Sequence, residues 1–329
     1  MEPNTIDPRY LPYSLEELAT HMPPVGAARD DRADRWLRHF VDSAAQYHEY
    51  LASNPDRRGI ALSRSRGPCQ IEKDERFWVA ASFMTVVRQP DPSAALEPLL
   101  AFVYGEQPPI AGLSSWSELL HGPLHLYFEA NLPSPRGYLD AVSDRIHLHP
   151  VEYVRQAARR TSSDSMRETL EGATNVDALL VAEATGFGLV VEAKVLSDVS
   201  HDVSFDPCRN QIARNVDVML ETNDRLPMPL SARRPDRTFF LLVTPRIFVE
   251  NWTTRLYGWL MRDYGDTRSN ALGRDLAHRS AADLARVPAR IGWTSWERIG
   301  SLIPGSAPWL ATADTGTDAA ETGQEVSGD

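Results

Sequence analysis

Hydrophobic positions recur at helical spacing through the first 150 residues, which predicts a mainly helical region. The run from Asp74 to Val87 is almost wholly apolar and is expected to be a buried helix. Pro-rich stretches at 107–109 and 131–136 are expected to be loops. Further helices are predicted at Ser14–Thr20, with Ser14 as N-cap, at Asp31–Ala52 and at Ala94–Tyr104.

After residue 150, short Val- and Leu-rich runs alternate with helical patterns. Strands are predicted at Val176–Ala182 and Phe187–Val195, joined by a hairpin turn, and at Thr238–Thr244. Helices are predicted at Val151–Glu171, from Asp206-Pro207 to Glu221 and from Pro245 to Tyr264, and residues 265–310 are expected to be helical and then irregular. This order predicts an α/β fold with a mixed β-sheet flanked by helices. The aromatic residues near Trp252, Tyr257 and Trp259 are expected to be core, the alternative being a surface that stacks on bases.

Composition narrows the class of protein. With 42% hydrophobic and 24% charged residues the chain is ordinary globular protein. It has no apolar run of 18 residues and no secretory signal, so a cytoplasmic protein without a membrane partner is expected. Two cysteines argue against a disulfide scaffold.

The charge is unevenly distributed. The net charge is −11, yet residues 311–329 alone hold five acids and no base and are expected to form a disordered tail. Residues 225–298 hold 13 arginines against 7 acids, which would suit a polyanionic substrate or simply give solvated helix faces. Lysine occurs only at Lys73 and Lys194, and a lysine near carboxylates can act at a water molecule in ways that arginine cannot.

Three ionisable residues are expected to meet on the hairpin. Symmetric pairing about Ala184-Thr185 places Asp177 opposite Glu192, and Lys194 projects from the same face two residues later. Their neighbours are almost all apolar, so the charges must be compensated by protons, bases or metal. Two carboxylates and the backbone carbonyl of Ala193 would suit Mg²⁺ or Mn²⁺. From the residues alone, a buried acid–lysine pair at a sheet edge stays the alternative.

The helix that follows adds polar groups. Gln211, Arg214 and Asn215 fall beside its apolar stripe, and Gln211 and Arg214, three positions apart, could hold a phosphate or a metal-bound water.

The pattern D-x14-E-A-K followed by Q-x-x-R resembles the PD-(D/E)XK superfamily, the fold of restriction endonucleases and many repair nucleases, over residues 151–262. The resemblance implies a restriction-endonuclease-like domain at 151–310 that binds metal through Asp177 and Glu192. Lys194 would then serve at the water, and Glu171, or its rival Glu168, would contribute from the preceding helix. As a hypothesis drawn from the residues of the following helix, Gln211 would orient the water and Arg214 and Asn215 would bind substrate. Val176 stands where the name-giving proline would be.

The resemblance implies a metal-dependent (endo)deoxyribonuclease that hydrolyses phosphodiester bonds in DNA for restriction, defence or repair. Two other functions stay open: an inactive nuclease fold acting as a nucleic-acid-binding or scaffold module, and another class such as a glycosidase, which would leave Lys194 and Gln211 without roles. The helical region 1–150 could form the interface of a homodimer or bind a partner protein.

Overall fold

A five-stranded mixed β-sheet with the strand order β1-β2-β3-β4-β5 forms the centre of the molecule. The computed structural model describes residues 11–23, 31–53, 71–160, 172–200, 209–308 and 310. The first three strands are antiparallel neighbours, and the last two run parallel to the third. The strands are β1 (Leu124–Leu132), β2 (Thr174–Ala182), β3 (Phe187–Ala193), β4 (Thr238–Thr244) and β5 (Ile291–Ser295). The predicted α/β fold with a mixed sheet is confirmed.

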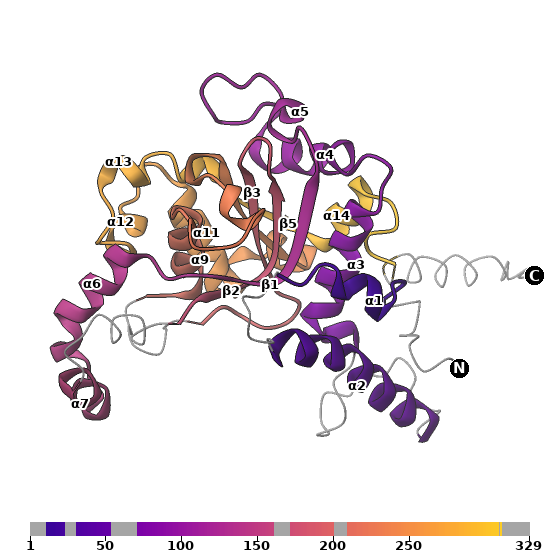
Figure 1. Ribbon diagram of the computed structural model, residues 1–329, viewed down its shortest axis with the longest axis horizontal. Coiled ribbons are helices and arrows are strands. Elements are labelled where there is room, and N and C mark those ends of the chain that lie inside the picture. The colour runs from indigo at the N-terminus through magenta and orange to yellow at the C-terminus, as the bar shows by residue number, and fades with distance from the viewer. Residues whose placement is uncertain are drawn as a thin grey trace, which may run out of the picture.

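Helices cover both faces of this sheet (Figure 1). One face packs against α3 (Glu75–Val87), α4 (Pro92–Tyr104) and α14 (Trp296–Leu302), and the other against α9 (Gln211–Met219), α11 (Leu256–Gly265) and α12 (Ala271–Asp275). Alternate residues of β4 therefore enter different cores: Phe239 and Leu241 join the first, and Phe240 and Leu242 the second. Burial on both sides explains why this strand is apolar throughout.

Shorter elements and an arm complete the fold. In Figure 1, α6 and α7 project away from the sheet at the lower left. No helix in the described part of the chain is both long enough and apolar enough to cross a membrane. The remaining elements are α1 (Leu15–Ala19), α2 (Asp31–Ser53), α5 (Trp116–Leu119), α6 (Arg136–Arg145), α7 (Glu152–Arg160), α10 (Arg246–Glu250), α13 (Ala281–Leu284) and the 3₁₀ turns η2 (Ile71–Lys73), η3 (Ile146–Leu148), η4 (Leu230–Ala232), η5 (Pro235–Arg237), η6 (Trp252–Thr254) and η7 (Pro288–Arg290).

The helices predicted before residue 105 are confirmed. At the first of them, Ser14 is the N-cap: its hydroxyl accepts from the Glu17 amide while the Glu17 carboxylate accepts from the Ser14 amide. At α3, Asp74 caps the helix instead of belonging to it.

A strand occupies residues 124–132, where the sequence analysis expected none. Leu124, Leu126, Phe128, Ala130 and Leu132 alternate with polar or amphipathic residues, and that period of two was the missed signal. β1 pairs with β2 along its length, from Leu124 opposite Ala182 to Leu132 opposite Thr174. The mainly helical region 1–150 therefore also supplies an edge strand to the sheet.

The hydrophobic core does not follow the division expected at residue 150. Buried side chains of α2, α3 and α4 join those of β2, β3, β4 and α14 in one cluster. Examples are Phe40, Phe83 and Leu100 from the first part and Leu180 and Leu241 from the second. Elements from both sides of residue 150 thus bury one another.

β5 was also missed, since residues 291–295 fall in the stretch that was expected to be helical and then irregular. A Cβ at Gly292 would lie 2.1 Å from Val103 Cγ1 and 2.8 Å from Tyr104 Cε1. Only glycine allows α4 to approach the strand this closely.

Three predicted helices have different limits. α9 begins at Gln211 with Asn210 as N-cap, and not at Asp206-Pro207, which lies outside the described residues. The helix expected from Pro245 to Tyr264 is broken into α10, η6 and α11, because Asn251 leaves the helical region (φ −112°, ψ 51°). The helix expected to reach Glu171 is described as α7 up to Arg160, and residues 161–171 and the tail 311–329 fall outside the described part.

Candidate active site

The predicted register of the hairpin is confirmed. Ala178 pairs with Val191 and Ala182 with Phe187, which centres the hairpin on Ala184-Thr185. The paired residues end at Ala178 and Val191, and one further step of the same register would place Asp177 opposite Glu192. The Asp177 carboxylate crosses to the neighbouring strand, where its Oδ2 accepts a hydrogen bond of 2.7 Å from the Ala193 amide. The two acids therefore meet where β2 begins and β3 ends.

Glu192 is the most heavily bonded side chain of the site. It is 1% exposed, and its two carboxylate oxygens accept from three side chains. Lys194 Nζ donates to Oε1 at 2.5 Å and Gln211 Nε2 donates to the same oxygen at 2.7 Å. Asn215 Nδ2 donates to Oε2 at 2.8 Å. Because Gln211 and Asn215 lie one turn apart on α9, that helix closes over the carboxylate.

Lys194 is fixed through its backbone as well as its side chain. Its amide donates to the Val243 carbonyl at 2.9 Å, and its carbonyl accepts from Trp296 Nε1 at 3.1 Å. β4 and α14 therefore hold the main chain while Glu192 holds the ammonium group. The residue is only 7% exposed, so the surrounding protein fixes the orientation of its side chain.

A second acid, Glu75, approaches Lys194 from the first residue of α3. Its Oε2 lies 3.8 Å from Lys194 Nζ. Its Oε1 accepts from the Val195 amide at 3.1 Å and from the Ser197 hydroxyl. Nothing in the sequence indicated this contact, because Glu75 and Lys194 are far apart in the chain and only the packing of α3 brings them together.

The electrostatics of the three groups are linked. Burial and the nearby Glu192 charge raise the pKa of Asp177 well above its usual range, although Lys194 and the Ala193 amide act in the opposite direction. Burial lowers the pKa of Lys194, but Glu192, Asp177 and Glu75 outweigh that effect and raise it overall. Lys194 therefore keeps its ammonium charge, while Asp177 lacks enough positive charge around it.

Glu129 is, after Glu75, the second acid near the site that could not be predicted from the sequence. It lies on β1 opposite Asp177 in the register that pairs Phe128 with Ala178 and Ala130 with Val176. Its φ of 51° is left-handed, a conformation that costs a non-glycine residue about 1 kcal/mol or more. Arg76 Nε lies 3.5 Å from its carboxylate. Strain of this kind is typical of functional sites, but neither motif nor spacing could have indicated it.

Arg214, expected to contact substrate, is hydrogen-bonded within the chain. Its guanidinium donates to the carbonyls of Gly172 and Ala173 at 2.8 and 3.0 Å and to Thr174 Oγ1 at 3.0 Å, so it ties α9 to the start of β2. Asn215, assigned with it, is buried against Glu192 and holds that carboxylate. The predicted helix acids Glu171 and Glu168 lie outside the described residues.

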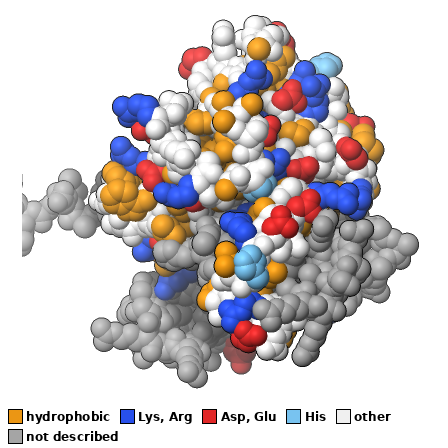
Figure 2. Space-filling view, turned by 90° about the vertical axis from the view of Figure 1, so that its left-hand side faces the viewer, with side chains coloured by type: hydrophobic (Ala, Val, Ile, Leu, Met, Phe, Trp, Pro, Cys, Tyr) orange, Lys and Arg blue, Asp and Glu red, His pale blue; other side chains and the backbone are white. Residues whose placement is uncertain are grey.

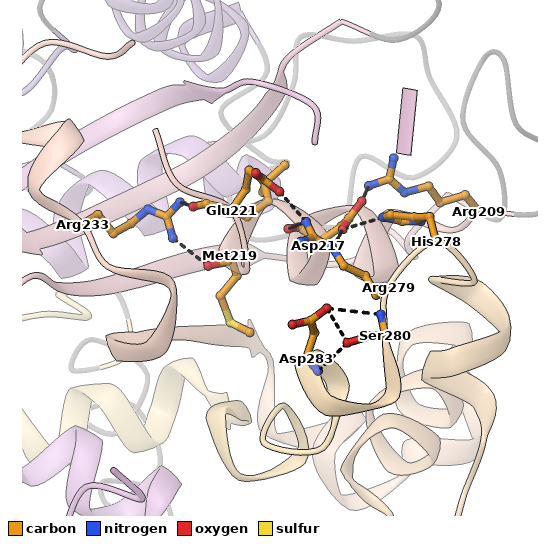
Figure 3. A network of polar contacts seen from close by, with 10 residues as sticks. Arg209, Asp217, Met219, Glu221, Arg233, His278, Arg279, Ser280 and Asp283 are labelled. Atoms are coloured by element: carbon orange, nitrogen blue, oxygen red, sulfur yellow. Dashed lines mark hydrogen bonds and ion pairs between the residues drawn. The ribbon is translucent and has the colours of Figure 1, made fainter. Parts of the chain in front are cut away.

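Two polar networks fix α9 and so position Gln211 and Asn215. At its start, the Asn210 side chain accepts from the Ala213 amide and donates to Tyr264 Oη at 2.7 Å and to Asp275. Further along, fully buried Asp217 is surrounded by three basic side chains (Figure 3). They are Arg209 at 2.6 Å, Arg279 at 2.7 Å and His278 at 3.0 Å.

Part of the arginine excess of residues 225–298 is paired with nearby acids. Figure 2 shows basic and acidic side chains interspersed on the face that it presents. Several of these arginines pair with acids close in the sequence, for example Arg268 with Asp266 and Arg234 with Asp236, both at 3.0 Å. Exposed pairs of this kind contribute little to stability, and they lower the field available to a polyanion.

The donors at the site fit a hard divalent cation. Across the described ranges no three His, Cys, Asp or Glu side chains are grouped as metal ligands. Asp177 and Glu192 nevertheless supply carboxylate oxygens, and within the described part Asp177 uses only Oδ2 in hydrogen bonding. The raised pKa of Asp177 indicates a place where added positive charge is favourable. Such a set, completed by a backbone carbonyl, waters and substrate oxygens, suits Mg²⁺ or Mn²⁺.

Comparisons of the chain with protein families, with characterised proteins and with solved structures find no match. The contacts within the chain therefore have to carry the functional argument.

Proposed function

We propose that the chain is a divalent-metal-dependent nuclease of the PD-(D/E)XK type, with a restriction-endonuclease-like core, that hydrolyses phosphodiester bonds in DNA. The observation that carries this proposal is the convergence of Asp177, Glu192, Lys194 and Gln211 at one end of the β2–β3 hairpin. The sequence pattern alone points to these four residues. Their meeting in three dimensions is a geometric result that the pattern did not require.

Each residue has a role that its contacts support. Asp177 and Glu192, with the Ala193 carbonyl, would hold Mg²⁺ or Mn²⁺, which when bound supplies charge neutralisation at the phosphate. The Lys194 ammonium would donate a hydrogen bond to the attacking water, since it already lies 2.5 Å from Glu192 Oε1. The Gln211 amide, at the same oxygen, would fix the direction of that water. Glu75 would keep the lysine in place from the opposite side.

The two lysines of the chain allow a matched test. Plasmid, linear duplex and single-stranded DNA are incubated with Mg²⁺, Mn²⁺ or EDTA, using the wild-type chain and the variants Lys194→Met and Lys73→Met. We expect cleavage to require a divalent cation. The cleavage rate should fall by at least about a hundredfold in Lys194→Met, which is the range for removal of an acid–base or electrostatic group. It should be unchanged in Lys73→Met. Circular dichroism establishes that each variant is folded.

The opposite pattern would reject the proposal. If Lys194→Met cleaves as well as the wild-type chain, the lysine has no part in the chemistry. If no DNA is cleaved with either metal and calorimetry shows no metal binding, the chain is better described as an inactive nuclease fold that binds nucleic acid or a partner.

A further inference from the structure

Two tryptophans of η6 and α11 lie at the protein surface. Trp259 on α11 is 49% exposed and Trp252 in η6 is half-buried, although core was the more usual expectation for this aromatic segment. Their neighbour Tyr257 is fully buried in the second core. The segment thus divides: Tyr257 anchors it, and the two indoles remain accessible.

The two indoles form a fixed surface, here termed the tryptophan platform (Trp252, Trp259 and Arg262). The ring centroids are 4.6 Å apart at an interplanar angle of 71°, and the Arg262 guanidinium lies 4.1 Å from the centre of the Trp252 ring. Gly258 makes this arrangement possible, because a Cβ there would lie 1.9 Å from the Trp252 carbonyl oxygen. Trp259 Nε1 also donates to the Thr253 carbonyl at 3.2 Å.

The segment that carries this platform contacts the loop that follows Lys194. Leu196 follows Lys194 by two residues and is 50% exposed, and its carbonyl accepts from Arg255 at 3.3 Å. The Asp198 carboxylate accepts from the Leu256 amide at 2.7 Å and so joins the loop after β3 to the first residue of α11. The loop that follows Lys194 is therefore hydrogen-bonded to the start of the helix that carries Trp259.

The local charge suits an anionic ligand with flat rings. Between Arg246 and Arg262 the sequence has three arginines and one acid, Glu250, which lies 3.8 Å from Arg246, and the Asp198 carboxylate approaches the same segment at the Leu256 amide. Indole faces stack on nucleobases whatever their sequence, and guanidinium groups pair with phosphates. Bases in a duplex are already stacked on one another, so only unpaired bases can use such a surface.

We propose that the tryptophan platform binds unpaired nucleotides of single-stranded DNA next to the scissile phosphate. This inference rests on the proposed nuclease function for its substrate class. It assigns a preference for single-stranded or locally unpaired DNA, in which bases stack on Trp259 and Trp252 while Arg255 and Arg262 contact the phosphates.

Binding measured without turnover tests the proposal. The full chain, in EDTA, is titrated into fluorescein-labelled oligothymidine of 20 nucleotides or into a labelled blunt duplex of 20 base pairs, and fluorescence anisotropy is recorded. These lengths correspond to about one to two binding sites. We expect tighter binding of the single strand, and about tenfold weaker binding of it by Trp259→Ala and by Trp252→Ala. Phe102→Ala is the matched control, because Phe102 is 51% exposed, lies under Arg298 at 4.5 Å and belongs to α4 on the other face of the sheet.

Several results would overturn the proposal. They are equal affinity for single strand and duplex, unchanged single-strand affinity in both tryptophan variants, and an equal loss in Phe102→Ala. Self-association of the wild-type chain that Trp259→Ala abolishes in sedimentation velocity would assign the platform to contacts between copies. Because binding is measured in EDTA, its outcome does not depend on turnover. Tryptophan-dependent binding together with no metal-dependent cleavage would therefore reject the nuclease function but not the platform. Cleavage without tryptophan-dependent binding would reject the platform alone.

Discussion

The carboxylate of Glu192 accepts hydrogen bonds from Lys194, Gln211 and Asn215 at a position that solvent hardly reaches. Removing either charge of a buried pair leaves the other without compensation, which typically costs about 3–5 kcal/mol, whereas removing both costs less than the sum. We therefore expect Glu192→Gln and Lys194→Met each to lower the free energy of unfolding by about that amount, and the double variant to recover part of the loss. Urea unfolding gives the free energy of unfolding of the wild-type chain, the two single variants and the double variant. Strict additivity would mean that the two side chains do not interact in solution.

Asp217 gives a prediction about pH. Burial alone would raise its pKa, but His278, Arg209 and Arg279 outweigh burial and lower it. In the unfolded chain an aspartate has a pKa of about 3.9. The charged Asp217 therefore stabilises the folded state fully above that pH, and this stabilisation is lost as the pH falls through the lower pKa of the folded state. We expect Asp217→Asn to lower the free energy of unfolding by about 3–5 kcal/mol at pH 7, and the difference from wild type to shrink below about pH 4.

Asp236 is the matched control for this acid. It pairs with Arg234 at 3.0 Å, but its side chain is 51% exposed. Asp236→Asn should change the free energy of unfolding by less than about 1 kcal/mol at pH 7. A pH-independent difference for Asp217→Asn, or an equal effect of the two substitutions, would contradict the assignment of a buried charge network.

At the scale of elements, the contact between η6 and α11 depends on one glycine. A methyl group at Gly258 would overlap the Trp252 carbonyl, 1.9 Å away, while nothing lies within 4 Å of a methyl group at Gly265 in the same helix. Gly258→Ala should therefore cost about 1–3 kcal/mol by overpacking and displace Trp252. Gly265→Ala should be neutral or stabilise by up to about 1 kcal/mol, because alanine favours the helix. Urea unfolding compares the two, and equal stability of the variants would show that η6 does not pack against α11 as described.

Elements with a strong local pattern could be predicted from the sequence. α3 and β4 are nearly uniform apolar runs, and the β2–β3 hairpin has a short turn that fixes its register. The pairing of Asp177 with Glu192 followed from that local symmetry. The break after α10 did not follow, because the new start at Leu256 depends on the Asp198 carboxylate, far away in the sequence.

The parts of the site that sequence could not supply are the long-range ones. Glu75 reaches Lys194 only because α3 packs at the end of β3, and Glu129 reaches Asp177 only because β1 pairs with β2. Arg214 has the residue type of a phosphate ligand, yet it bonds to the backbone before β2. A motif gives residue types and spacing, but tertiary packing decides which groups face the site.

At the scale of the whole molecule, residues on both sides of position 150 depend on one another. β1 pairs with β2, and the faces of β3 and β4 that carry Val191 and Leu241 are covered by helices from before residue 105. We therefore expect a fragment of residues 151–329 to lack a stable fold, because the edge of β2 and an apolar sheet face would be open to water. Residues 1–150 alone should also be unfolded or aggregate. Mixing the two fragments should restore the far-ultraviolet circular dichroism of the intact chain and a cooperative urea transition. A monomeric 151–329 fragment that unfolds cooperatively by itself would show that the part after residue 150 is an independent domain, and the N-terminal helices would then have to be explained by a role other than completing the core.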